Sequence, residues 1–272
     1  MVKVLYLKFR HMTARVDIDA DAKELADVLK KLFVISKVKG DEPSTYLSIV
    51  KAEGYSLLIE GHLVMKDVDL ARVLYGINNH LRNAILKMPD FQEVLIHGAI
   101  ATYSQRSVLF IGQSGCGKTS LSLLIGKGER WPGDEYVWIS PESGLAIEEP
   151  LPVQVKPIGL DVVPKSKRTR AVRISDERDM PHFLFPAVPG FETANDLVVF
   201  LEYESEAETR LWCPPVADLP ALVMPSVLIK GKRHCAYLFF LKFLDIAKPQ
   251  LLCMRYSDLN NAAKMIEERL SE

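Results

Sequence analysis

The amino-acid sequence predicts an α/β protein of 272 residues, with a smaller α+β domain at residues 1–89 and an α/β domain at residues 90–272. Three observations support this fold class. Short runs that alternate apolar and polar residues dominate the first part, as in strands with one wet face. From Val94 onward, apolar strands and helical segments follow one another in β–α–β order. A glycine-rich segment lies between one of these strands and a helix.

In the first domain, strands are expected where apolar and polar positions alternate, at residues 2–9, 46–50 and 55–59. Helices are expected at residues 21–33 and 67–87, because leucine, isoleucine and valine recur there at three-to-four spacing. Pro89 marks the domain boundary, since its ring disfavours a helical conformation in the preceding residue.

In the second domain, the sequence predicts strands at residues 94–101 and 107–111, a helix from about Gly117 to Ile125, a hairpin at 136–140 and 144–148, and a buried strand at 197–201. The apolar run 236–244 is interpreted as a buried strand or core segment. An amphipathic helix capped by Ser257 is expected at residues 257–270.

Composition excludes several classes of function. The 34 basic and 35 acidic residues leave a net charge of −1, which gives no support for binding nucleic acid or an anionic membrane. The longest apolar stretch is far shorter than a membrane span of about 20 residues, and the N-terminus resembles no signal peptide. The four cysteines lack Cys-x-x-Cys spacing, which favours reduced thiols over disulfides or a metal knuckle. We therefore expect a cytoplasmic protein.

Gly112-Gln113-Ser114-Gly115-Cys116-Gly117-Lys118-Thr119 satisfies the phosphate-binding-loop (P-loop, Walker A) pattern G-x-x-x-x-G-K-[ST]. Its glycines let backbone N–H groups converge on phosphate oxygens. Lys118 would contact the β- and γ-phosphates, and the Thr119 hydroxyl would bind Mg²⁺. We expect residues 112 to 120, with Ser120 the last of them, to bind a nucleoside triphosphate. The thiol of Cys116 is interpreted as a small neutral side chain.

The same loop serves transporters, switches and kinases, so other motifs must discriminate among them. Transporter ATPases need an L-S-G-G-Q motif and an acidic pair that ends an apolar strand, and both are absent. The Asn-Lys-x-Asp motif that binds guanine in GTPases is absent too. Gly133-Asp134-Glu135 precedes the strand at 136–140, where both carboxylates can lie beside the γ-phosphate. A solvated turn is the alternative for this pair. His97, on the strand before the loop strand, is either an active-site residue or a core histidine.

These residues resemble the HPr kinase/phosphorylase family and the HPr-kinase-related kinases. The resemblance covers about residues 94–202 and depends on His97-Gly98-Ala99, the loop, Gly133-Asp134-Glu135 and the strand 196–202. It implies an HPr-kinase-like P-loop core and ATP and Mg²⁺ as cofactors. It also implies that Asp134 is the general base toward a serine hydroxyl, Glu135 the acid on the metal side, and His97 an active-site residue.

The sequence departs from the family in ways that bear on the substrate. Glu135 replaces the second aspartate and Thr119 the usual serine, and both replacements keep the ligand chemistry. The Glu-x-Arg-Gly stretch that supports phosphorolysis is missing from residues 153–161. The chain looks more like the compact HPr-kinase-related kinases of peptide-modifying pathways, which implies a ribosomally made precursor, such as a lasso peptide precursor, as acceptor.

The expected function is thus an ATP-dependent serine kinase acting on a peptide or protein, with Asp134, His97 and Lys118 as catalytic residues and Thr119 and Glu135 as metal ligands. A kinase of a small-molecule hydroxyl and a non-catalytic ATP-sensing protein are the alternatives. The basic run Lys165–Arg170 and Lys156 are either solvated or contact the nucleotide or an acidic acceptor. The first domain is expected to help recognise the substrate, and a homo-oligomer is left open.

Overall fold

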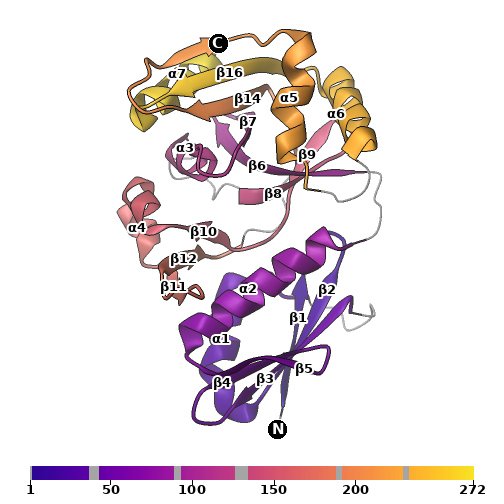
Figure 1. The fold of residues 1–272 in the computed structure, drawn as a ribbon, viewed down its shortest axis with the longest axis vertical. Coiled ribbons are helices and arrows are strands. Elements are labelled where there is room, and N and C mark those ends of the chain that lie inside the picture. The colour runs from indigo at the N-terminus through magenta and orange to yellow at the C-terminus, as the bar shows by residue number, and fades with distance from the viewer. Residues whose placement is uncertain (1, 37–42, 89–92, 126–133, 188–191, 229–232) are drawn as a thin grey trace. The chain divides into compact units, whose positions relative to one another are not determined.

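Helices and strands form two units, and the protein has the mixed α/β class that its sequence predicts (Figure 1). The computed structural model describes residues 2–36, 43–88, 93–125, 134–187, 192–228 and 233–272, without the side chains of Asp134, Ile158, Ser166, Arg233 and His234. The first unit contains residues 1–89, 150–160 and 165–189, and the second contains residues 90–149, 161–164 and 190–272. In the part of the chain that is described, no helix is long and apolar enough to cross a bilayer.

The first unit is built on a five-stranded sheet in the order β1-β2-β3-β4-β5. Its strands are β1 (Lys3–Lys8), β2 (Thr13–Ile18), β3 (Thr45–Lys51), β4 (Tyr55–Ile59) and β5 (His62–Val68). Only β2 and β3 run parallel; the other neighbours are antiparallel. The sequence reasoning missed β2 and β5. In β5 the period-two signal is lost because Leu63 and Val64, adjacent in the chain, are both more than half exposed.

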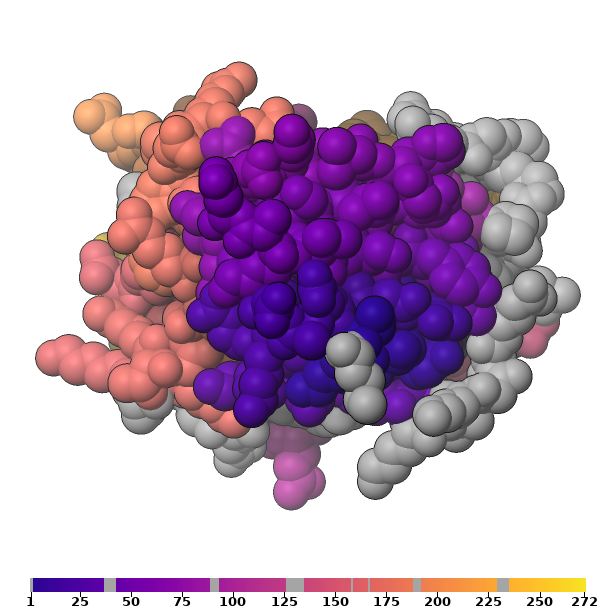
Figure 2. Space-filling model, turned by 90° about the horizontal axis from the view of Figure 1, so that it is seen from below, coloured from indigo at the N-terminus to yellow at the C-terminus, as the bar shows by residue number. Residues whose placement is uncertain are grey.

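Two helices supply the apolar side chains that the first sheet buries. They are α1 (Lys23–Leu32), preceded by the 3₁₀ turn η1 (Ala20–Ala22), and α2 (Leu70–Leu86). Both coincide with predicted helices, and their apolar positions are fully buried at Leu25, Leu29, Ile77 and Leu81. Figure 2 looks onto the surface of this unit, in indigo and purple.

A three-stranded antiparallel sheet completes the first unit, although its residues were expected in the second domain. It has the order β10-β12-β11 and comprises β10 (Val153–Val155), β11 (Val172–Ser175) and β12 (Pro181–Phe185), with η2 (Pro157–Val162) and α4 (Lys165–Arg168) between β10 and β11. Side chains of α2 explain this placement. Arg82 donates to the Pro152 carbonyl at 3.1 Å, and Arg72 pairs with Asp179 at 2.8 Å. The expected boundary residue Pro89 lies outside the described residues.

The second unit contains an eight-stranded mixed sheet in the order β13-β9-β8-β6-β7-β14-β16-β15. Its strands are β6 (Val94–Tyr103), β7 (Arg106–Gly112), β8 (Asp134–Ile139), β9 (Leu145–Glu148), β13 (Glu192–Ala194), β14 (Leu197–Tyr203), β15 (Arg210–Trp212) and β16 (Gln250–Tyr256). The predicted strands at 94–101, 107–111 and 197–201 are confirmed, and so is the hairpin, as β8 and β9. β7 runs antiparallel to β6 but parallel to β14.

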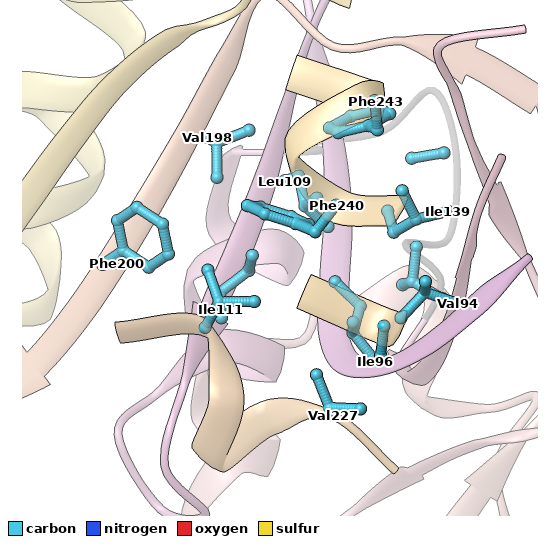
Figure 3. Close-up of a cluster of buried hydrophobic side chains, with 14 of the residues drawn as sticks. Val94, Ile96, Leu109, Ile111, Ile139, Val198, Phe200, Val227, Phe240 and Phe243 are labelled. Atoms are coloured by element: carbon cyan, nitrogen blue, oxygen red, sulfur yellow. The ribbon is translucent and has the colours of Figure 1, made fainter. Parts of the chain in front are cut away.

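Helices cover both faces of this sheet. On one face, α3 (Lys118–Ile125) and α7 (Leu259–Ser271) enclose an apolar cluster that includes Phe110, Leu121 and Ile266. On the other face, α5 (Leu219–Val223) and α6 (Arg233–Ala247), with the 3₁₀ turns η3 (Val216–Asp218) and η4 (Met224–Ser226), enclose a second cluster. Figure 3 shows Phe240 and Phe243 of α6 in this second cluster.

Two local expectations in the second unit need correction: residues 236–244 are the expected core segment but not a strand, and the predicted cap of the last helix is wrong. The run 236–244 is part of helix α6, since Ala236, Phe240 and Phe243 are buried at helical spacing while Leu238 is 61% exposed. A short run that is apolar except for Lys242 does not distinguish a strand from a buried helix by periodicity. At the start of α7 the cap is Asp258, which accepts a hydrogen bond from the Asn261 amide at 2.8 Å, and not Ser257.

Candidate functional site

The glycine-rich loop joins β7, which ends at Gly112, to α3, which begins at Lys118. Between them the backbone φ angles of Gly115 and Gly117 are +87° and +88°. Residues with a side chain are disfavoured in this left-handed region. Gly115 and Gly117 therefore let the chain turn sharply from the strand into the helix. The N-terminus of α3 therefore lies at the carboxyl end of β7, where its N–H groups and dipole favour an anion.

Tyr256, at the end of β16, holds this loop in place. Its buried hydroxyl donates a hydrogen bond to the carbonyl of Cys116 at 2.6 Å. A Cβ atom at Gly117 would overlap the same hydroxyl, so the glycine is needed for space as well as for its φ angle. Burial raises the pKa of Tyr256, which keeps the hydroxyl protonated as a donor. Sequence reasoning missed this residue, because a tyrosine that ends an apolar strand is typical of a core.

Lys118 is 4% exposed and lies against the first half of the loop. Its Nζ donates to the carbonyl oxygens of Gly112 at 2.8 Å and Gln113 at 2.9 Å. The Sγ of Cys116 is 4.0 Å from the same nitrogen. Burial raises the pKa of the Cys116 thiol, and the positive charge of Lys118 only partly opposes this effect. Two neutral carbonyl groups of the loop are thus among the partners of Lys118, and phosphate oxygens could replace them.

The acidic pair lies at the level of the end of the loop strand, with β6 between them. Gly98 of β6 is paired with Ile111 of β7 on one side and with Glu135 of β8 on the other. In the next row, Ala99 is paired with Phe110 and Asp134. The backbones of Asp134 and Glu135 are therefore two strand spacings, about 10 Å, from the end of β7. The side chain of Asp134 and the preceding Gly133 lie outside what the structure describes.

His97 lies on the strand between the loop strand and the acidic pair. Its register partner is Tyr136, the residue after Glu135. Alternation along β6 puts His97 on the same face as Ala101, which packs in the cluster with Leu121 of α3. The half-buried imidazole is thus on the side of the sheet from which the loop helix starts. The structure brings together the loop, His97 and the backbone of the acidic pair.

Glu135 has a φ angle of +71°. A non-glycine residue in the left-handed region costs about 1 kcal/mol or more, and such residues are frequent at functional sites.

Thr119 and Ser120 occupy the first turn of α3, where the Thr119 carbonyl accepts a hydrogen bond from Ser122 at 2.9 Å.

The expected metal ligands, Thr119 and Glu135, supply one hydroxyl and one carboxylate. Among the residues that the structure describes, no three His, Cys, Asp or Glu side chains gather into a metal-binding group. Mg²⁺ does not need such a group, because it usually keeps several waters and takes phosphate oxygens beside one or two protein ligands. This sparse donor set fits a magnesium ion that arrives with a nucleotide.

A pocket of about 580 Å³ opens on the other side of the loop, next to β14. Loop residues form one wall, and the opposite wall comes from the ends of β14 and β15 and from the segment α5–η4. Its lining residues are Ile111, Gly112, Gln113, Ser114, Gly115, Cys116, Phe200, Leu201, Glu202, Tyr203, Trp212, Ala221, Leu222, Pro225, Ser226 and Cys253. Sequence reasoning assigned no role to Glu202, although an acid that ends a fully apolar strand was a signal for it.

The basic residues singled out in the sequence belong to the first unit, whereas the loop belongs to the second. Lys165–Arg168 forms the short helix α4, and Lys156 is an exposed residue directly after β10. Burial and the nearby Arg170 lower the pKa of Lys167. The structure therefore does not bring these cations to the loop within one unit.

The comparison with known proteins adds no family to this description. No protein-family model matches the chain, and no curated protein matches it either.

Proposed function

We propose that this protein is an ATP- and Mg²⁺-dependent kinase with an HPr-kinase-like P-loop core, which phosphorylates a serine hydroxyl of a peptide or protein. One observation carries the proposal. The register of β7, β6 and β8 sets the glycine-rich loop, His97 and the Asp134-Glu135 backbone side by side at the same level of one sheet. A phosphate-binding loop beside a base and a metal-side acid is the minimum equipment for phosphoryl transfer.

In this mechanism the loop amides and the N-terminus of α3 bind the phosphates of the donor. Lys118 exchanges the carbonyls of Gly112 and Gln113 for phosphate oxygens, which carry negative charge and so attract the ammonium more strongly. Asp134 accepts the proton of the acceptor hydroxyl. As it does so, the hydroxyl oxygen bonds to the γ-phosphorus, and the bond from that phosphorus to ADP breaks. Glu135, near the start of β8, would hold Mg²⁺ together with Thr119. Bound Mg²⁺ would neutralise charge on the phosphates.

His97 has a role that depends on its place between the loop and the acids. From β6 its imidazole would donate a hydrogen bond to an oxygen of the transferring group. Replacing it with glutamine keeps a donor at a similar distance, whereas alanine removes the donor. We therefore expect His97→Gln to retain more activity than His97→Ala at the same pH.

The test of the kinase assignment is phosphate transfer from labelled ATP to a candidate acceptor peptide. Lys118→Ala and Asp134→Asn should each lower the rate by at least about 10²-fold, the usual contribution of one such group. Asp245→Asn is a matched control, because Asp245 is exposed on α6, away from the loop. Full activity of Asp134→Asn would remove the base assignment. ATP binding without transfer to any peptide, protein or small hydroxyl compound would favour a nucleotide-sensing protein.

The acceptor class is a separate part of the proposal. The missing Glu-x-Arg-Gly stretch disfavours HPr, and likeness to the compact HPr-kinase-related kinases favours a ribosomally made precursor peptide. Mass spectrometry of precursor peptides incubated with ATP should detect a phosphoryl addition on a serine. The same peptide with that serine replaced by alanine is the control. Phosphorylation of a small hydroxyl compound, and of no peptide, would contradict this acceptor class.

A further inference from the structure

We propose that the pocket beside β14 binds the nucleoside of the phosphoryl donor, with a purine ring between aromatic side chains and the ribose hydroxyls on Glu202. This assignment rests on the proposed kinase function, because it concerns the other end of the same donor. It assigns a ligand, and the direction in which that ligand lies, to a pocket whose loop wall is shared with the proposed phosphate site.

The pocket and the predicted catalytic residues lie on opposite sides of the loop strand. β7, which carries the loop, lies between β6 and β14. His97 and the acidic pair lie on the β6 and β8 side, whereas the pocket is lined by the end of β14. A nucleoside triphosphate that reacts at its γ-phosphate on the β6 side directs its nucleoside away from that side. The pocket is where a ligand leaving the loop in that direction finds a concave surface.

The walls of the pocket carry aromatic and apolar side chains. Phe200, Tyr203 and Trp212 are the aromatic residues of the lining, and Leu222 and Pro225 add apolar side chains. Phe200 is only 4% exposed and belongs to the floor, so Tyr203 and Trp212 are the rings available to a base. Tyr203 is 54% exposed, a large exposed fraction for an aromatic ring beside a pocket. Aromatic side chains stack on any base, since every base has a π-face. The volume of about 580 Å³ is within the range of small-molecule sites.

Two polar side chains of the lining, those of Glu202 and Ser226, have defined hydrogen bonds. The carboxylate of Glu202 is held by Arg255, whose Nε donates to Oε2 at 3.0 Å. An ionised carboxylate only accepts hydrogen bonds, and acids at the ends of strands commonly bind ribose hydroxyls in dinucleotide sites. Ser226 donates to the Gly112 carbonyl at 3.4 Å, which joins the far wall to the loop. Ile111 and Phe200 also belong to the apolar cluster of Figure 3, so the floor is rigid.

The experiment compares calorimetric binding of ATP, 2′,3′-dideoxy-ATP and inorganic tripolyphosphate, each with Mg²⁺. Glu202→Gln should weaken ATP about tenfold, the loss of a charge-assisted hydrogen bond, and leave tripolyphosphate unchanged. It should also leave dideoxy-ATP nearly unchanged, because that ligand lacks the ribose hydroxyls. Glu204→Gln is the matched control, since Glu204 also pairs with Arg255, at 3.2 Å, but does not line the pocket.

A second variant tests the stacking. Trp212→Ala should weaken ATP and dideoxy-ATP equally, by about tenfold, without changing tripolyphosphate. Equal effects of Glu202→Gln and Glu204→Gln on ATP would overturn the proposal. The proposal would also be overturned if Glu202→Gln or Trp212→Ala raised the KM for the acceptor and left nucleotide binding intact. The pocket would then hold the acceptor. If Lys118→Ala leaves tripolyphosphate binding unchanged, or nothing binds at all, the proposed function fails, and the nucleoside assignment with it.

Discussion

Replacing Tyr256 with phenylalanine removes a single hydroxyl that is donated to the glycine-rich loop. The hydrogen bond to the Cys116 carbonyl is 2.6 Å long, and the tyrosine is 1% exposed. Losing one partner of a buried hydrogen bond costs about 1–3 kcal/mol, so we expect the free energy of unfolding to fall by about 2 kcal/mol. Since a loss of 1 kcal/mol lowers Tm by about 2–4 °C at this size, Tm should fall by about 4–8 °C.

The same change should weaken nucleotide binding, because the lost contact positions the loop and not the core alone. Thermal unfolding and calorimetric titration with tripolyphosphate check the two effects together. Tyr46→Phe is the control, because Tyr46 is 39% exposed on β3 of the first unit. A Tyr256→Phe protein with normal Tm and normal tripolyphosphate affinity would refute the reasoning. A lowered Tm with full affinity would show that the hydroxyl supports the core without positioning the loop.

Three further predictions concern stability and thiol reactivity. Burial raises the pKa of Cys253 to about 11 from an ordinary value near 9, so the unfolded chain loses this proton first as the pH rises. The free energy of unfolding should therefore decline between about pH 9 and 11, and Cys253→Ala should flatten that decline in denaturant titrations. At pH 8, iodoacetamide should modify the exposed Cys213 well before Cys253, as measured by mass spectrometry, and equal rates would contradict the burial. Asp69→Ala removes the cap of α2, a 2.7 Å acceptor for the Arg72 amide, and should cost about 1 kcal/mol; an unchanged denaturation midpoint would contradict it.

The sequence predicted the parts of the site that depend on local patterns. The glycine-rich loop was recognised because its glycines and Lys118 lie close together in the chain, between a strand and a helix with clear periodicity. His97 and the acidic pair were recognised through motif order, and the register of β6 and β8 brings them to one level. Their catalytic roles remain predictions.

Other residues could not be found in this way because they act over long sequence separations. Tyr256 contacts a loop residue 140 positions earlier, and no local pattern reports such a contact. Glu202 lines a pocket whose opposite wall is formed by α5 and η4. The secondary structure of residues 236–244 could not be decided from the sequence, because a buried strand and a buried helix can both consist almost entirely of apolar residues. The side-chain contacts between α2 and the segment 150–189 could not be predicted either, because the residues that form them are far apart in the sequence.

The attachment of residues 150–189 to the first unit constrains how this chain can be divided. A gene fragment that ends at residue 89 would encode α2 without Pro152 and Gln154, which accept hydrogen bonds from Arg82 and Asn78. Those buried polar groups would then face solvent or each other. A fragment that begins at residue 90 would carry strands β10 to β12 with no helix to pack on. Because the two units interleave along the chain, a cut at the sequence boundary would yield two fragments that each lack part of a unit.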